Sequence, residues 1–280
     1  MAARSQGFHP SVDQFLQPGL VKKSQWFTPV RGVSIEMPTQ TRAQTQFLQT
    51  AESDTFATMM GVFNSSAEAG IFVDSGANDG MWSLLAAKHG MPAVAVEPQL
   101  LCLGYIAAAA KRNALSIQLH HKVLSPHAFD VNVRTDHCTG SSQFLPDGQT
   151  GDSLGRTKRT TTATTHARVS SVSLDDLLGR QVVALWHIDT EGAEVDVLRS
   201  AERLFANQRI RRVLLEWNPT RWARFNISRD DAIRVAQQVF GGWSCRDFCG
   251  RKAVDWVERS TKWNWKTCRK EEIYCTLPNY

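Results

Sequence analysis

The segment VDSGANDG, residues 73–80, carries the clearest chemical signal in this sequence of 280 residues. It lies between a short apolar run and a helical pattern, so Gly76 and Gly80 would form the turn between a strand and a helix. Glycine lets the backbone turn tightly and lets a ligand approach closely, and the helix that follows offers unpaired N–H groups. The spacing predicts a nucleotide-type binding loop.

This loop differs from two common phosphate-binding loops. Asn78 stands where the dinucleotide fingerprint has its second glycine, and no lysine followed by serine or threonine comes after it, as it would in a P-loop. The carboxylate of Asp74 would repel a pyrophosphate but attract the cationic aminopropyl-carboxylate part of S-adenosylmethionine. The charge of Asp74 therefore favours S-adenosylmethionine as the cofactor. It disfavours the alternative that the protein is an NAD-dependent oxidoreductase.

A second carboxylate, Glu97, closes the next predicted strand, 21 residues after Gly76. In this position a carboxylate can accept hydrogen bonds from both hydroxyls of a ribose. NAD sites use the same position, so Glu97 supports a nucleoside cofactor without choosing between the two.

A second acidic motif, HIDTEGAEVDVL, begins at His187 and crowds three carboxylates into a strand-to-helix turn. Acids at a helix N-terminus also complement its dipole, which is the structural alternative for Glu191 and Glu194. If the reaction removes a proton, Asp189 and Glu191 are the preferred candidates for the base. His187 is the third candidate, and its alternative is a buried core histidine.

A third polar strand end, LLEWNP, places Glu216 and Asn218 after an apolar run. They either face a ligand or only end the strand before Pro219. Together with Asp189 they offer oxygen ligands that suit magnesium, so a metal-assisted reaction is an alternative. We expect no metal.

The apolar patterning predicts the elements that position these motifs. Short apolar runs predict strands at 71–73, 93–98, 117–124, 182–188 and 212–217. Helical spacing predicts helices at 47–63, 81–89, 100–113, 193–205 and 229–240. Strands that alternate with helices favour a doubly wound, mostly parallel sheet covered on both faces, with ligands at the carboxyl ends of its strands.

The flanking regions differ from this core. We expect an N-terminal arm over residues 1–50, the catalytic domain over 51–240, and a basic segment rich in Trp and Cys over 241–280 that completes the sheet. Residues 139–171 are rich in Gly, Ser and Thr, which predicts a flap or partly formed hairpin at the rim of the site.

The net charge of +5 lies entirely in residues 221–280, which also hold five of the nine tryptophans. Basic residues interleaved with aromatic ones can bind nucleic acid or an anionic surface. The segment also contains seven acids, so we favour tryptophans that pack on one another and regard nucleic acid as an unlikely partner.

The six cysteines are too few for a disulfide scaffold, but four fall within residues 245–275, where disulfides remain open. The sequence contains neither an apolar signal region nor 18 consecutive apolar residues, so we expect no membrane span. The default expectation is a cytoplasmic protein. A luminal or extracellular one is the alternative if the chain is a fragment.

The sequence resembles the FkbM-type methyltransferase family, which belongs to the seven-stranded, Rossmann-like, S-adenosylmethionine-dependent fold. The resemblance spans about residues 55–225 and rests on VDSGANDG, on VEP at 96–98, on VSLDDLL at 172–178 and on HIDTEGAEVDVLRSA at 187–201. It implies an α/β fold with a seven-stranded sheet and O-methylation of a hydroxyl on a small molecule, lipid or sugar.

The resemblance also implies roles for single residues. The amino-acid part of S-adenosylmethionine would be held by Asp74, Gly76, Asn78 and Gly80. Glu97 would bind the ribose, and Asp189 with Glu191 would border the methyl group. One departure is His187, where the family often carries lysine. The alternative to an enzyme is a non-catalytic protein of the same fold that binds its partner through the basic, Trp-rich tail.

Overall fold

A computed structural model gives the fold of the chain. It describes residues 12–17, 19–21, 26–30, 33–42, 53–65, 69–135, 138, 166–249, 253–261 and 272–278.

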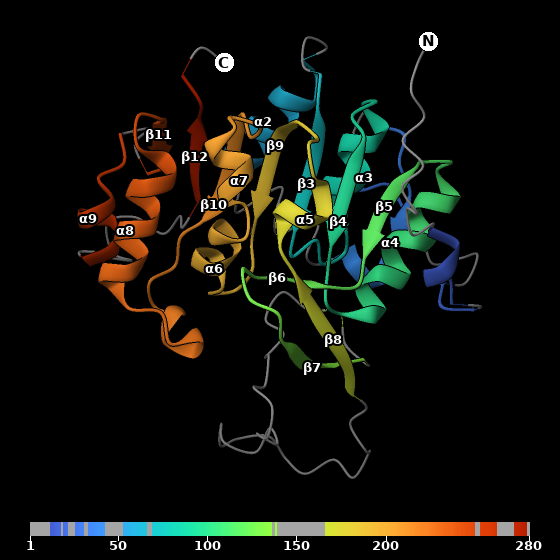
Figure 1. Cartoon of the computed structure of the whole chain (residues 1–280). Coiled ribbons are helices and arrows are strands. Elements are labelled where there is room, and N and C mark those ends of the chain that lie inside the picture. The colour runs from blue at the N-terminus through green and yellow to red at the C-terminus, as the bar shows by residue number, and fades with distance from the viewer. Residues whose placement is uncertain are drawn as a thin grey trace.

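A seven-stranded sheet forms the centre of the molecule (Figure 1). Its strands are β3 (Ile71–Ser75), β4 (Ala93–Val96), β5 (Ile117–His120), β9 (Val183–Ile188), β10 (Arg212–Glu216), β11 (Ser244–Asp247) and β12 (Glu272–Thr276). Their order is β11-β12-β10-β9-β3-β4-β5, and only β12 runs antiparallel to its neighbours. The predicted α/β fold class, with a mostly parallel seven-stranded sheet, is confirmed.

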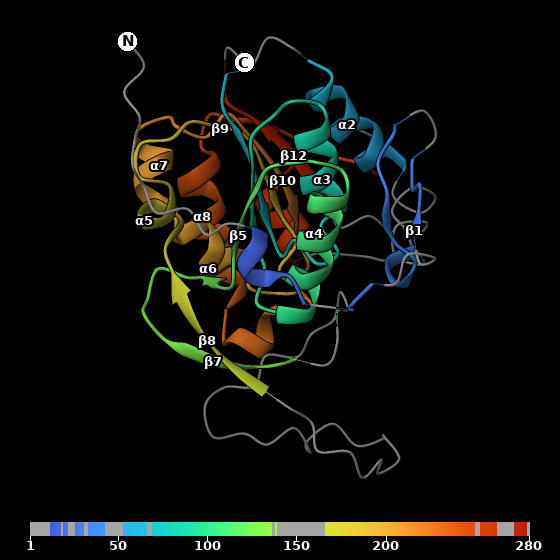
Figure 2. The same cartoon turned by 90° about the vertical axis from the view of Figure 1, so that its right-hand side faces the viewer.

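Helices cover both faces of the sheet (Figure 2). One face carries α2 (Ser53–Phe63), α3 (Met81–Lys88) and α4 (Leu100–Arg112). The other carries α5 (Leu174–Leu178), α6 (Glu194–Arg199), α7 (Glu202–Ala206), α8 (Arg229–Phe240) and α9 (Trp256–Thr261). Successive strand residues such as Phe72 and Val73 enter opposite cores. Because both faces are buried, β4 is apolar throughout and β9 nearly so, without the alternation of a strand that has one exposed face.

The single helix predicted over 193–205 is wrong, because two helices, α6 and α7, stand there. Asp175 on α5 explains the break. Its carboxylate accepts hydrogen bonds from the backbone N–H groups of Arg203 and Leu204, at 2.8 and 2.9 Å. These bonds satisfy the first turn of a new helix, so a side chain distant in sequence starts α7.

A smaller three-stranded sheet is made of β6 (Val123–Leu124), β7 (Asp130–Arg134) and β8 (His166–Val172), in the order β6-β8-β7. Strands β7 and β8 pair antiparallel and extend beyond the carboxyl ends of the central strands (Figure 1). β8 occupies the last part of the predicted flap, and residues 139–165 lie outside the described residues.

Short elements make up the described part of the N-terminal arm and one loop. They are η1 (Val12–Phe15), β1 (Trp26–Phe27), β2 (Met37–Pro38), η2 (Thr39–Thr41) and η3 (Trp222–Phe225). Of the helix predicted over 47–63, residues 53–63 form α2, and residues 47–52 lie outside the described ranges.

Three tryptophans of the basic C-terminal region pack in the second core. The ring of Trp222 meets that of Trp217 edge to face, and the ring of Trp256 stacks on Phe240. Trp243 also contacts Phe240, while Trp263 and Trp265 lie outside the described residues. Rings that are packed in a core cannot stack on nucleic-acid bases. The positions of Trp222, Trp243 and Trp256 therefore favour a structural role over nucleic-acid binding.

Disulfides tie two parts of the fold together. Cys245 on β11 and Cys275 on β12 stand directly opposite in register and are bonded. A second disulfide joins Cys102 on α4 to Cys138. None of the helices in the described part of the chain combines the length and the hydropathy that a membrane crossing requires.

The disulfide between β11 and β12 should stabilise the edge of the sheet by restricting the unfolded chain. It joins residues 30 positions apart, so replacing Cys245 and Cys275 together by alanine should lower the free energy of unfolding by about 2 to 4 kcal/mol. Urea denaturation without reductant measures this loss. Ser244→Ala, an exposed change in the same strand, is the control, and an equal loss there would contradict the prediction.

Candidate functional site

The glycine loop, residues 76–80, joins β3 to α3 and has three residues with positive φ. Gly76 and Gly80 both have φ near +78°, and Asn78 has φ of +50°. This left-handed region is open to glycine and, among other residues, most readily to asparagine. Asn78 can therefore stand in for the second glycine of the dinucleotide fingerprint without a large backbone cost.

The loop touches the end of β9 through its backbone. A Cβ atom at Gly76 would lie 1.9 Å from the carbonyl oxygen of Asp189, so only glycine fits. The backbone N–H of Asp189 in turn donates to the carbonyl oxygen of Ser75 at 3.0 Å. The fold thus brings the first and second motifs of the sequence into direct contact.

Glu97 fastens the loop to the end of β4. Its carboxylate accepts hydrogen bonds from the backbone N–H groups of Asn78 and Gln99, both at 2.8 Å. Burial raises the pKa of Glu97 to about 7, and these hydrogen bonds lower it only in part. A buried carboxyl with such a pKa has little positive charge around it.

Asp74 lies beneath the loop with no exposed surface. Its Oδ2 accepts a hydrogen bond from the hydroxyl of Ser83 at 2.7 Å, and its Oδ1 is 2.8 Å from Nδ1 of His187. Both carboxylate oxygens therefore have protein partners. Its direct contact with a cofactor stays a prediction, and in this structure its charge acts on the site through His187.

His187 stands on β9 beside Asp74 and against the ring of Trp82, with the ring centroids 6.2 Å apart. Burial alone would lower its pKa. The hydrogen bond and charge of Asp74, with the charges of Asp189 and Glu272, outweigh burial and raise the pKa above its ordinary value. His187 is thus a buried histidine of the core that is also part of the site.

The acidic turn, residues 189–194, holds two more carboxyls with raised pKa values. Glu191 has φ of +60° and pairs with the guanidinium of Arg221. Oε1 of Glu194 accepts hydrogen bonds from the N–H of Gly192 at 2.8 Å and from the hydroxyl of Thr190 at 3.1 Å. Burial raises the pKa of both glutamates to about 7. These bonds hold the acidic turn in shape, which agrees with a structural role for Glu194 at the start of α6.

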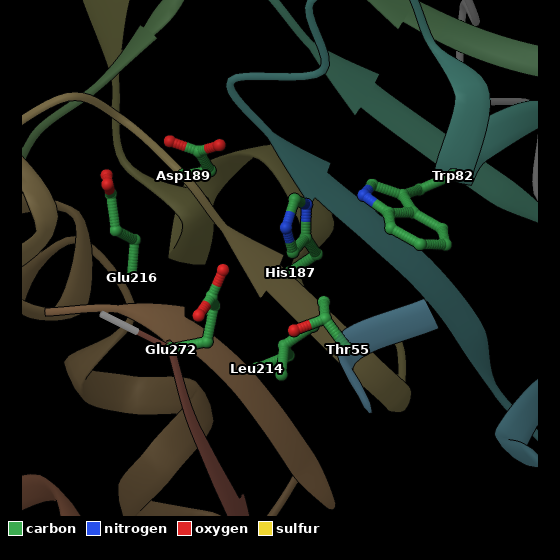
Figure 3. A pocket seen from close by; sticks show the side chains of 7 residues that line it. All are labelled: Thr55, Trp82, His187, Asp189, Leu214, Glu216 and Glu272. Carbon is green, nitrogen blue, oxygen red and sulfur yellow. The ribbon is translucent and has the colours of Figure 1, made fainter. Parts of the chain in front are cut away.

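A pocket opens beside these residues, at the carboxyl ends of β9 and β10 (Figure 3). Its empty space, with the open solvent at its mouth included, is about 350 Å³, and it is lined by Thr55, Trp82, His187, Asp189, Leu214, Glu216 and Glu272. Two of the predicted site residues, His187 and Asp189, thus line one pocket. Gly76, Asn78 and Glu97 lie on the neighbouring strand ends and not in its wall.

Several residues of the site were not recognised from the sequence. Thr55 comes from α2 and Glu272 from β12, so no local motif marks them. Arg221 also carried no signal, although it pairs with both Glu191 and Glu216. Asn218 accepts hydrogen bonds from the N–H and hydroxyl of Thr220, which supports the view that it ends the strand.

Among the side chains that the structure describes, no group of three or more His, Cys, Asp or Glu residues is arranged to hold a metal ion. The expectation of no metal stays a prediction.

Comparisons with known proteins bear on the same segment. The family profile described as "Methyltransferase FkbM domain" matches residues 74–241, more than half of the chain. A solved human methyltransferase 10 domain containing protein is 13% identical, with a TM-score of 0.38 and 82% of each chain covered. The N-terminal domain of human METTL16 is 11% identical, with a TM-score of 0.38, over 100% of this chain and 98% of that one. Both structural likenesses are weak, and no curated protein sequence matches.

The contact between Gly76 and Asp189 can be tested against a matched glycine. Gly90 has the same sign of φ, +82°, but nothing lies within 4 Å of a Cβ built there. Gly90→Ala should therefore cost only the backbone strain, about 1 to 2 kcal/mol. Gly76→Ala adds a clash with backbone and should cost about 3 kcal/mol or more in the free energy of unfolding. Equal losses in chemical denaturation would disprove the close contact.

Proposed function

The chain belongs to the FkbM methyltransferase family, and we propose that it transfers a methyl group from S-adenosylmethionine to a hydroxyl of a small molecule, lipid or sugar. One observation carries the choice of cofactor. Asp189, Glu216 and Glu272 line one pocket beside the glycine loop, and the guanidinium of Arg221, which lies against Glu216, also pairs with Glu191. A cationic donor would be attracted to these carboxyls, whereas the pyrophosphate of NAD would be repelled.

The residues that would hold the donor follow from the loop and its neighbours. The backbone at Gly76, Asn78 and Gly80 would take its amino-acid part, close to the start of α3. Glu97 would accept a hydrogen bond from the ribose, since a carboxylate has about four acceptor positions and its hydrogen bonds from Asn78 and Gln99 use three. Asp189 would border the methyl group.

When bound, S-adenosylmethionine supplies a methyl group on a positively charged sulfur, whose C–S bond breaks as the new O–C bond forms, leaving the electron pair on sulfur. The protein has to orient the acceptor oxygen in line with that bond and to receive its proton.

His187 is the base that the geometry supports best. When Nδ1–H of His187 donates to Oδ1 of Asp74, Nε2 is left to take the proton of the acceptor hydroxyl. The sequence favoured Asp189 or Glu191 for this role. Glu191 is paired with Arg221, which favours its charged form but engages the carboxylate elsewhere. Asp74 thus acts as a positioning residue for His187.

The disulfides also bear on where the protein works. Cytoplasmic thiols are kept reduced, so the bonds Cys102–Cys138 and Cys245–Cys275 favour an oxidising compartment. They support the luminal or extracellular alternative over the cytoplasmic default.

Donor binding tests the proposal directly. Isothermal titration calorimetry should detect S-adenosylmethionine binding at roughly micromolar affinity, and Glu97→Gln should weaken it by about tenfold or more because a charged acceptor is lost. Affinity should rise between pH 6 and pH 8, since Glu97 ionises near pH 7 and the ionised form attracts the cation. Glu202→Gln, an exposed change on α7, is the control. Absence of binding to the unaltered protein would refute the proposal.

The pairing of His187 with Asp74 predicts a distinctive titration. In NMR spectra, Cε1–H of His187 should titrate above the ordinary histidine value of about 6.5. Asp74→Asn should move that pKa downward, because burial is then opposed only by Asp189 and Glu272. Ser83→Ala alters the other oxygen of Asp74 but keeps its charge, so the pKa should stay raised. An unchanged His187 pKa in Asp74→Asn would exclude the positioning role.

A further inference from the structure

The pocket beside the glycine loop gathers carboxylates from three neighbouring strands. Asp189 follows β9, Glu216 ends β10 and Glu272 begins β12, and all three line the same cavity (Figure 3). Such a convergence brings negative charge to one small volume. Asp189 is the residue expected to border the methyl group, and the acidic lining continues from it to Glu216 and Glu272. This part of the pocket is where we expect the acceptor.

Two of these carboxylates stand directly opposite each other. Glu216 and Glu272 are register partners in the antiparallel pair of β10 and β12. Like charges in that relation destabilise a strand pair. The arrangement therefore costs stability, which is a reason to seek its purpose in binding.

Two basic side chains that the structure describes at this cluster, Arg221 and His187, also have other acidic partners. Arg221 lies 3.3 Å from Glu216 but also pairs with Glu191. His187 is held by Asp74 at 2.8 Å. Among the described residues at the pocket, negative charge thus exceeds positive charge.

An independent feature, the hydroxyl of Thr55, points to a polar ligand. Thr55 is 2% exposed, lines the pocket and has no hydrogen-bond partner for Oγ1 among the described residues. Figure 3 shows this hydroxyl turned toward Leu214 and Glu272. A buried hydroxyl is rarely left unpaired, because desolvation without a partner is unfavourable. The missing partner is therefore expected to enter the pocket.

The remaining walls are apolar. Trp82 and Leu214 offer an indole ring and a branched aliphatic chain. Such surfaces suit the carbon skeleton of an organic molecule, and an indole ring also attracts a cation at its face. Carboxylates, a hydroxyl and an aromatic wall together match a protonated amine, which has several N–H donors and a carbon chain.

We propose that this pocket binds the methyl acceptor and that the acceptor carries a protonated amine near the hydroxyl that is methylated, as in an amino alcohol or amino sugar. The amine is bound by Glu216 and Glu272 and donates to Thr55. This inference rests on the proposed function. In the reaction, the hydroxyl proton goes to Nε2 of His187 as the O–C bond forms, and the amine keeps its protons.

A cationic acceptor also explains how His187 can act as a base. The charges of Asp189 and Glu272 help to raise its pKa in the free protein. A protonated amine beside those carboxylates offsets their effect and lowers the pKa of His187 when the acceptor is in place. Acceptor binding would thereby favour the neutral form of His187, which can accept the hydroxyl proton.

Binding of matched probes tests the proposal. Ethanolamine and glucosamine are titrated into the protein saturated with S-adenosylhomocysteine, beside their neutral N-acetyl derivatives, at low salt and with calorimetric detection. At least one amine should bind about tenfold or more tightly than its N-acetyl derivative. Absence of binding by both amines, or equal binding of the neutral forms, would overturn the inference.

Substitutions locate the binding. Glu272→Gln and Thr55→Val should each weaken amine binding by about fivefold or more, whereas Thr55→Ser, which keeps the hydroxyl, should restore it. Glu202→Gln changes the charge equally on an exposed helix and should have no effect. Unchanged binding in both Glu272→Gln and Thr55→Val would place the amine elsewhere and overturn the inference.

Two further arms separate the alternatives. Mg²⁺ alone is titrated under the same conditions, and Mg²⁺ binding that Glu272→Gln abolishes and that displaces the amine would assign the carboxylates to a metal instead. S-adenosylmethionine is titrated in parallel. If the protein binds S-adenosylmethionine but does not bind the amines more tightly than their N-acetyl derivatives, only this inference is refuted. If the unaltered protein does not bind S-adenosylmethionine at all, the proposed function itself is refuted.

Discussion

A buried pair of side chains, Asp74 and His187, joins the two central strands of the sheet, and the geometry of the site depends on it. A buried carboxylate is tolerated only with partners, and Asp74 has two, the imidazole of His187 and the hydroxyl of Ser83. The pair keeps β3 and β9 in register just below the point where Gly76 meets the backbone of Asp189. His187 itself lines the pocket.

Around this pair, the described site is deficient in positive charge. Burial raises the pKa values of Glu97, Glu191 and Glu194 to about 7, so a cation bound beside them would favour their ionised forms. Under the two proposals, a cationic donor at the glycine loop and a cationic acceptor in the neighbouring pocket would each have this effect.

The C-terminal region has a structural part in this arrangement. Strand β12 enters the sheet antiparallel beside β10, is tied to β11 by the disulfide Cys245–Cys275, and brings Glu272 to the pocket. Tryptophans that by composition resembled a nucleic-acid surface pack instead on Trp217 and on Phe240 of α8. The basic segment thus completes the sheet and supplies part of the lining of the proposed acceptor pocket.

The sequence by itself determined the features that depend on local spacing. Strand, glycine turn and helix follow one another within residues 71–88, so the loop, its positive-φ positions and the alternating α/β order were all predictable from neighbours in the chain. Only the tertiary structure decided which side chains meet. Thr55, Arg221 and Glu272 reach the site from distant elements, Asp175 breaks a predicted helix by capping α7, and Asp74 turns from the loop toward His187. Such contacts depend on strand order and register, which local patterns do not encode.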